Sequence, residues 1–192
     1  MNARARSTPY AVLGMLSLAP MSGYDIRKEA ASSIGYFWSE SFGQIYPALR
    51  ELAGKGLIRQ RAGGKAGSRD RQVYEITERG REALRAWRSE PPREQPARNE
   101  LLLKLFFGAR ESAGGEIDWI EGRLKEEMQR LREFQRIREQ IMKEQPDHPS
   151  LPFWLMTVSY GEHHVRTTIR WCRETLKALR AMERGPAKRG SP

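Results

Sequence analysis

Residues 42–58 of this 192-residue chain place polar side chains of three kinds on one side of a predicted short helix. Gln44 carries an amide that donates and accepts at once, the pattern that forms paired hydrogen bonds with the edge of an adenine. Tyr46 can donate to a phosphate or stack on a ring, and Arg50, one turn further on, fits a phosphate better than a base. With Pro47 beside them, these side chains form a small face that could enter a groove.

Two of these side chains also have plain structural explanations. Gln44 lies three residues after Ser41, and the two can close a capping box at the start of the helix. The Tyr46 ring can be partly buried by the rest of the fold. Both explanations stay open at this point.

The helix that carries this face has an apolar stripe on its opposite side. Gly54, Lys55 and Gly56 end the helix, and Leu57 and Ile58 restart the chain as a strand. The pattern predicts the recognition helix of a winged helix-turn-helix, and hence DNA binding. The stripe repeats at i, i+3, i+4 and i+7 and consists of Ile45, Ala48, Leu49 and Leu52.

A β-hairpin is predicted to follow. Its first strand begins at residues 57–60, and residues 71–77 alternate polar with apolar side chains as a returning strand does. The connection, AGGKAGSRD, is rich in glycine and basic. It is either a solvated hairpin tip or a wing that contacts phosphates or the minor groove. The cations available to such a wing are Lys65, Arg69 and Arg71.

Two helices are predicted before the recognition helix. Residues 1–8 suggest a frayed basic arm, after which Pro9 opens an almost wholly apolar helix that Pro20 ends. Such a helix must be buried on most of its sides.

The second of these helices begins at Ser22, with Asp25 near its positive end. Its cations Arg27 and Lys28 either touch the DNA backbone, as the first helix of such motifs does, or lie on a solvated face. The aromatic residues 36–38 follow it, either packed between helices or beside a ligand.

The composition limits the class of protein. The net charge is +10, and the first 90 residues carry 15 Lys and Arg against 9 Asp and Glu. A basic excess attracts polyanions. A single cysteine, Cys172, cannot form an internal disulfide, and neither a signal peptide nor an apolar stretch of roughly 20 residues is present. We expect a cytoplasmic protein.

The second half is predicted to be helical. After a helix that Thr77 caps, a segment rich in Pro, Glu and Arg separates two domains. Helices are expected over 100–108, 116–144 and from Ser150 onward, with Gly114 and Gly115 as a break. The expected division is a DNA-binding domain at 1–90, a linker at 91–98, a helical domain at 99–184 and a disordered tail at 185–192.

The last helix carries an apolar seam in steps of three and four over about four heptads, with Glu162 as its one polar member. The preceding helix can cover only part of it, so we expect a second subunit to cover the remainder. The predicted dimer interface consists of Leu155, Val158, Val165, Ile169, Cys172, Leu176 and Leu179.

Large aromatic side chains flank this seam. They either anchor subunit packing or line a pocket for a flat aromatic effector, to which Tyr160 and Glu162 could add polar groups. The candidate effector residues are Trp119, Phe153, Trp154, Tyr160 and Trp171.

The sequence gives little support for a catalytic site or a metal-binding site. His163 and His164 are adjacent, so on a helix they point about 100° apart and cannot readily chelate one ion. The residue types of a hydrolase triad occur at Asp147, His148 and Ser150. These residues share one proline-rich turn, and no oxyanion-hole motif accompanies them. No phosphate-cradling glycine motif is present. We expect no catalytic residue, no metal and no cofactor.

The chain resembles the PadR family of bacterial transcriptional regulators. The matching segments are YAVLGMLSLAPMSGYDI, FW at 37–38, FGQIYPALRELAGKGLI and RQVYEITERGREAL, within residues 9–86. The second half is similar in pattern to the longer helical C-terminal region of the AphA-like branch.

The resemblance implies a homodimer on a palindromic operator, usually a repressor that an effector releases. Phenolic acids are effectors for founding members and planar drugs for others. It also implies that Gln44, Tyr46 and Pro47 meet bases and backbone and that Lys65 and Arg69 belong to the wing.

The sequence therefore predicts a mainly α protein in which an N-terminal winged helix-turn-helix binds double-stranded DNA and long C-terminal helices dimerise the chain. An alternative is a helical scaffold or adaptor whose winged helix binds another protein. A steep loss of binding with rising salt would favour DNA over such an apolar protein interface.

Overall fold

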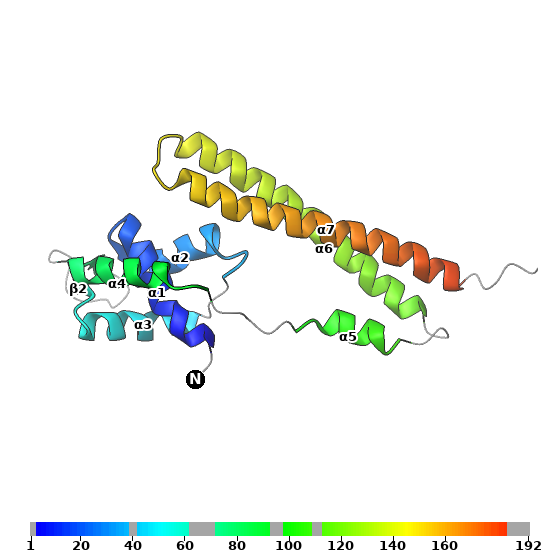
Figure 1. The fold of residues 1–192 in the computed structure, drawn as a ribbon, viewed down its shortest axis with the longest axis horizontal. Helices are drawn as coiled ribbons and strands as arrows, with labels where there is room; N and C mark the ends of the chain where they lie inside the picture. The colour runs from blue at the N-terminus through cyan, green and yellow to red at the C-terminus, as the bar shows by residue number, and fades with distance from the viewer. Residues whose placement is uncertain (1–2, 39–41, 62–71, 93–97, 109–112, 184–192) are drawn as a thin grey trace, which may run out of the picture. The chain divides into compact units, whose positions relative to one another are not determined.

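The computed structural model describes residues 3–38, 42–61, 72–92, 98–108 and 113–183. The chain divides into two compact units, Met1–Gln95 and Pro96–Pro192. The first contains helices, a small sheet and the candidate recognition helix, and the second contains helices only (Figure 1). The predicted mainly α class is confirmed, and the boundary falls inside the predicted linker.

Helix α1 (Ala3–Leu18) lies at the centre of the first unit. Val12, Leu13 and Leu16 are almost fully buried, as its apolar sequence predicts. The prediction of an arm over 1–8 is wrong, because the helix begins at Ala3 and holds Pro9 in its interior. Proline removes one backbone donor there, and the buried residues that follow stabilise the helix across that gap.

Helix α2 (Gly23–Ser33) begins with the predicted cap, and the cap is a complete box. The Ser22 hydroxyl accepts from the Asp25 amide at 3.1 Å, and the Asp25 carboxylate accepts from the Ser22 amide and hydroxyl at 3.1 and 2.6 Å. These bonds, the side-chain one foremost, hold the pKa of Asp25 below its ordinary value of 3.8.

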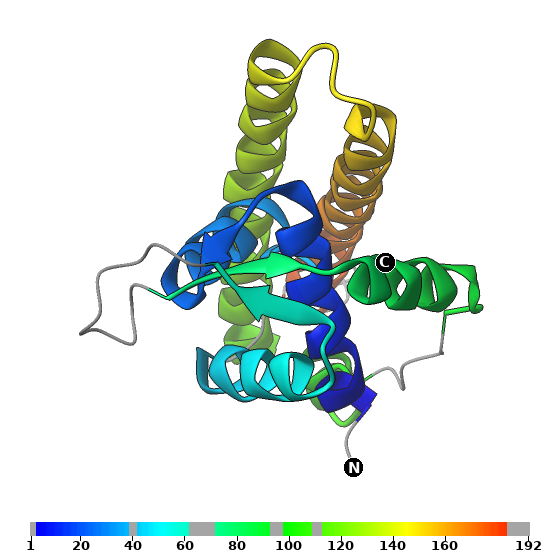
Figure 2. The same ribbon diagram turned by 90° about the vertical axis from the view of Figure 1, so that its left-hand side faces the viewer.

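Three short strands form one antiparallel sheet in the order β1-β3-β2. The predicted hairpin is present as β2 (Ile58–Gln60) and β3 (Val73–Ile76), drawn beside α3 in Figure 2. Strand β1 (Met21–Ser22) pairs with the far edge of β3 and was not predicted. Two residues are too few to show an alternating pattern.

Helix α4 (Glu78–Ser89) is joined closely to the start of the hairpin. The Thr77 hydroxyl accepts from the Gly80 amide at 3.1 Å and donates to the Gly56 carbonyl at 2.8 Å. A Cβ at Gly80 would lie 2.1 Å from the Leu57 carbonyl oxygen, so only glycine permits this approach. Gly56 has a φ of 68°, the left-handed conformation that favours glycine.

The second unit contains α5 (Glu100–Phe106), α6 (Ala113–Glu144) and α7 (Leu151–Glu183). Helices α6 and α7 pack along each other as an antiparallel pair (Figure 1). Asn99 caps α5 through the Leu102 amide, as expected. Gly114 and Gly115 lie inside α6 and do not break it. No described helix has both the length and the apolar character needed to cross a membrane.

Helix α6 buries one charged residue. Glu127 is fully buried, whereas the next residue, Met128, is exposed. Arg123 and Arg130, one turn to either side, form ion pairs with the Glu127 carboxylate at 2.7 and 3.3 Å. This pairing allows a charged side chain to be buried there.

Most of the seam of α7, which was predicted as the dimer interface, is already buried within the single chain. Leu101 and Leu105 of α5 pack against the core around Cys172, and Leu155 and Leu179 are half-buried. Of the seven predicted interface residues, only Leu155 and Leu179 keep exposed surface that a second subunit could contact, and the interface stays a prediction. The fully covered seam residues are Val158, Val165, Ile169, Cys172 and Leu176.

The two long helices pack tightly at Gly161 of α7. A Cβ on Gly161 would lie 2.4 Å from the ring of Phe134, which is buried on α6. Gly122 also lies inside α6, but a Cβ there would meet nothing within 4 Å. The two glycines therefore differ in packing while sharing a helical backbone.

We predict opposite effects for alanine at these two positions. Gly161→Ala is expected to destabilise the protein by about 1–3 kcal/mol, because the buried Phe134 ring has to move. Gly122→Ala should stabilise it by up to about 1 kcal/mol through helix propensity. Urea unfolding followed by circular dichroism at one protein concentration measures both. Equal stabilisation by the two substitutions would contradict the close crossing.

Candidate nucleic-acid interface

Helix α3 (Phe42–Gly54) is anchored by its apolar stripe, as predicted. All four stripe residues are buried in the core of the first unit, where α3 packs mainly on α1. This burial fixes which side of α3 faces solvent. The buried side chains are Ile45, Ala48, Leu49 and Leu52.

The opposite side of α3 is exposed and holds every predicted contact of this helix. Gln44, Tyr46, Pro47 and Arg50 are all exposed. Among the described residues, Gln44 and Arg50 have no hydrogen-bond or ion-pair partner. Ser41, the alternative partner of Gln44, lies outside the described residues. The face is thus a solvated polar surface on a rigidly packed helix.

Tyr46 joins α3 to the start of α2. Its side chain is 38% exposed, so the predicted alternative of partial burial also holds. A Cβ on Gly23 would lie 2.7 Å from the Tyr46 ring, which shows how closely the ring approaches the first residue of α2. Tyr46 thus sets the spacing of the two helices and still presents part of its ring to solvent.

Helix α2 adds two cations to the exposed surface. Arg27 and Lys28 are both exposed, and the Arg27 guanidinium lies over the Tyr24 ring at 5.2 Å. This stacking orients Arg27 without neutralising its charge. Lys28 lies near the Asp25 carboxylate and contributes to lowering the pKa of that group.

The wing is described only at its base. Lys65, Arg69 and Arg71 lie outside the described residues, as does the tail at 185–192. Arg61 continues the ladder by donating its amide to the Val73 carbonyl at 2.9 Å. Its exposed side chain adds a cation that the sequence analysis did not single out, although the run Arg59-Gln60-Arg61 displays it.

The five rings predicted to line an effector pocket do not form one group. Trp154 and Trp171 are 17 positions apart on α7, roughly 25 Å along the axis. Trp154 stacks on His148 at 4.3 Å, Trp171 packs on the core around Cys172, and the Lys104 ammonium lies over Trp119 at 5.5 Å. Three of the rings are exposed: Phe153 and Tyr160 lie on the first half of α7, and Trp119 lies on α6.

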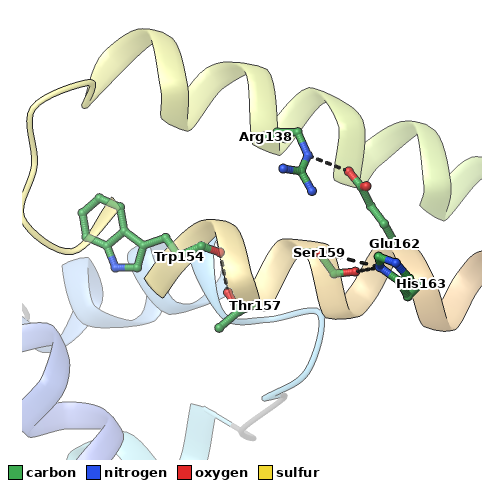
Figure 3. Close-up of polar contacts among 6 residues, drawn as sticks. All are labelled: Arg138, Trp154, Thr157, Ser159, Glu162 and His163. Atoms are coloured by element: carbon green, nitrogen blue, oxygen red, sulfur yellow. Dashed lines mark hydrogen bonds and ion pairs between the residues drawn. The ribbon is translucent and has the colours of Figure 1, made fainter. Parts of the chain in front are cut away.

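Glu162 and His163 on this half of α7 are engaged within the chain (Figure 3). Arg138 of α6 donates to the Glu162 carboxylate at 2.9 Å, which pairs the one polar member of the seam. The Nδ1 atom of His163 lies 2.8 Å from the Ser159 carbonyl oxygen, one turn earlier. Glu162 therefore serves packing between α6 and α7.

Helices α2 and α3, followed by a β-hairpin and α4, define a winged helix-turn-helix, the fold of a large class of DNA-binding proteins. Residues 12–86 match the PadR-like transcriptional regulator family, and residues 97–180 match the C-terminal region of the virulence activator alpha family. The chain belongs to the PadR-like family of transcriptional regulators, which are not enzymes.

Two relatives illustrate the match. The negative transcriptional regulator PadR of Bacillus subtilis is 30% identical over 138 residues, which are 71% of this chain and 76% of that protein. Its structure with operator DNA has a TM-score of 0.74 at 26% identity, over 89% of this chain and 98% of that one. Its structure with p-coumaric acid has a TM-score of 0.70 at 26% identity, over 88% of this chain and 96% of that one.

The second relative is the virulence activator AphA of Vibrio cholerae. Its structure has a TM-score of 0.73 at 28% identity, over 92% of this chain and 99% of that one. The likeness to both relatives extends through the long C-terminal helices.

We predict that Arg50 contacts a phosphate and not a base. Arg50→Ala should weaken binding to every duplex and lower the slope of log K against log salt by about one. Fluorescence anisotropy of a labelled duplex across a salt series measures the slope. Arg88→Ala, which removes an exposed cation from α4, is the matched control and should leave the slope unchanged. A slope unaffected by Arg50→Ala would exclude the phosphate contact.

Proposed function

We propose that this protein is a homodimeric repressor that binds a palindromic operator and is released by a small aromatic effector. The observation that carries the proposal is the exposed polar face of α3, opposite a fully buried apolar stripe. The PadR structure with operator DNA supports the DNA-binding part. A regulator of bacterial DNA is expected to act in the cytoplasm.

On the operator, α3 of each subunit would enter the major groove. Gln44 would read an adenine, with Tyr46 and Pro47 beside it and Arg50 on a phosphate. Two such helices fit successive major grooves when they lie roughly 34 Å apart. The wing, whose predicted cations are Lys65, Arg69 and Arg71, would contact flanking backbone, together with Arg61 at the described base of the hairpin.

A second subunit has an apolar surface to cover on α5. We call this surface the α5 patch, and it is large for a helix of seven residues. Contiguous exposed apolar patches of this kind mark interaction sites. Covering it with the same patch of a second copy would give a two-fold symmetric contact, which a palindromic operator requires. The α5 patch consists of Leu102, Leu103, Phe106 and Phe107, with Phe106 81% and Phe107 74% exposed.

An effector would act by binding one arrangement of the subunits better than another. The effector can release the operator only if its affinity for the free arrangement of the subunits exceeds its affinity for the DNA-bound arrangement. The complex of PadR with p-coumaric acid supports a small aromatic molecule as that effector.

We predict specific binding to the DNA immediately upstream of the protein's own gene. Affinity should fall steeply as salt rises, and excess unrelated DNA should not displace the protein. Gln44→Ala should cost about 1–3 kcal/mol on this site and little on unrelated DNA. Salt-insensitive binding, or binding unaffected by Gln44→Ala and Tyr46→Ala together, would contradict the proposed reading of DNA by α3.

We also predict that the α5 patch holds the dimer. Replacing Phe106 and Phe107 by Ser should shift sedimentation equilibrium from dimer to monomer and weaken binding to a palindrome more than to a half-site. Met142→Ser removes another exposed apolar side chain, from α6, and should leave the dimer intact. A dimer that survives both serine substitutions would place the interface elsewhere.

A further inference from the structure

A groove of about 430 Å³ runs along one side of the helix pair α6 and α7, which Figure 1 shows lying along each other. Its apolar lining consists of Leu124 and Met128 from α6 and Leu176 from α7, and Met128 is 39% exposed. The α6 residues of the groove extend from Glu121 to Arg132, roughly 16 Å along the helix axis. The groove therefore offers an apolar strip of about three helical turns that solvent can reach.

Positively charged side chains border this strip on both helices. Lys125 and Arg132 of α6 and Arg173 of α7 line the groove and are exposed. In the described part of the chain, none of these three side chains has a hydrogen-bond or ion-pair partner. A fourth cation, Arg180, pairs with Glu121, the one acid among the lining residues. Four cations against one acid leave the groove with an excess of three positive charges.

A strip that is apolar along its middle and positive on both sides matches an amphipathic helix whose apolar side chains are flanked by Glu or Asp. A small anion matches it less well. The groove is more open than enclosed, so much of such a ligand would stay in solvent. A nucleic acid could place phosphates on the cations, but its backbone has no apolar side to lay on Leu124 and Met128. The lining therefore favours a protein helix.

The exposed apolar surfaces of a second copy of this chain lack the negative charge that would complement the groove. The α5 patch is flanked by Glu100 and Lys104, which form an ion pair with each other at 2.8 Å. Residues 151–160, which carry the exposed Phe153 and Tyr160, contain no acidic residue. Neither of these surfaces would bring an excess of carboxylates to the groove.

We propose that the groove between α6 and α7 is the docking site for an acidic amphipathic helix of a different protein. The apolar side of that helix would cover Leu124 and Met128. Its carboxylates would pair with Lys125 and Arg132 on one side and with Arg173 on the other. Opposite charges speed such an encounter and lose their effect as salt rises. No residue of the groove belongs to α3, so the proposal goes beyond DNA binding and does not rest on it.

Two synthetic peptides test the groove in the full-length protein. The first has about 14 leucine and glutamate residues, roughly four turns, with the leucines on one side and a covalent staple that keeps it helical. The second replaces every glutamate by lysine. Fluorescence anisotropy of the labelled peptides, with up to about 0.5 mM protein, measures the affinity. The acidic peptide should bind, and the basic peptide should not.

Two lysines of α6 give a matched pair of variants, measured at about 0.15 M salt, where charges beyond roughly 8 Å are screened. Lys125→Glu reverses a charge inside the groove and should raise the Kd of the acidic peptide about three- to tenfold. Lys143→Glu makes the same change at an exposed lysine roughly 16 Å beyond Arg132 along α6 and should leave the Kd unchanged. Met128→Gln, which makes the apolar strip polar, should also raise the Kd.

The possible outcomes distinguish the acidic helix from other occupants. Equal effects of Lys125→Glu and Lys143→Glu, or no binding of the acidic peptide, would overturn the proposal. Displacement of the peptide by unrelated duplex DNA, with no effect of Met128→Gln, would assign the groove to a polyanion instead. A fall in the sedimentation mass caused by Lys125→Glu would assign it to a second copy. A protein that binds the acidic peptide but no upstream DNA would refute the proposed function and leave the docking site standing.

Discussion

The burial of one side of α3 against α1 is the constraint on which the rest of the first unit depends. Ile45, Ala48, Leu49 and Leu52 can enter the core only if Gln44, Pro47 and Arg50 face outward. The free energy that orients the polar face therefore comes from apolar contacts, at about 25 cal/mol per Å² of buried apolar surface. The polar side chains themselves are left to contact another molecule.

A second constraint fixes the hairpin relative to that helix. Thr77 bonds to both Gly56 and Gly80, and Gly80 lies directly against the Leu57 backbone. The end of α3, the start of β2 and the start of α4 are thereby held at one point. The strands at the base of the hairpin therefore cannot turn independently of α3.

The sequence predicted features that depend on local spacing and missed those that depend on distant partners. The stripe of α3 and the caps at Ser22, Thr77 and Asn99 follow from residues within one or two turns. Strand β1 exists only because β3 lies beside it, and Glu127 is buried only because two arginines pair with it. The seam of α7 was correctly seen as buried, but heptad spacing cannot tell a partner helix in the same chain from one in another subunit.

The single thiol of the chain has a practical consequence. Cys172 is fully buried, and burial raises the pKa of its thiol above the ordinary value of 9.0, so little reactive thiolate forms near neutral pH. The native protein is therefore close to a cysteine-free background for site-directed labelling. A cysteine introduced on the solvent side of α3 would carry a spin label alone. In the proposed homodimer, the separation of two such labels, measured by electron–electron resonance, would report the spacing of the two recognition helices with and without DNA.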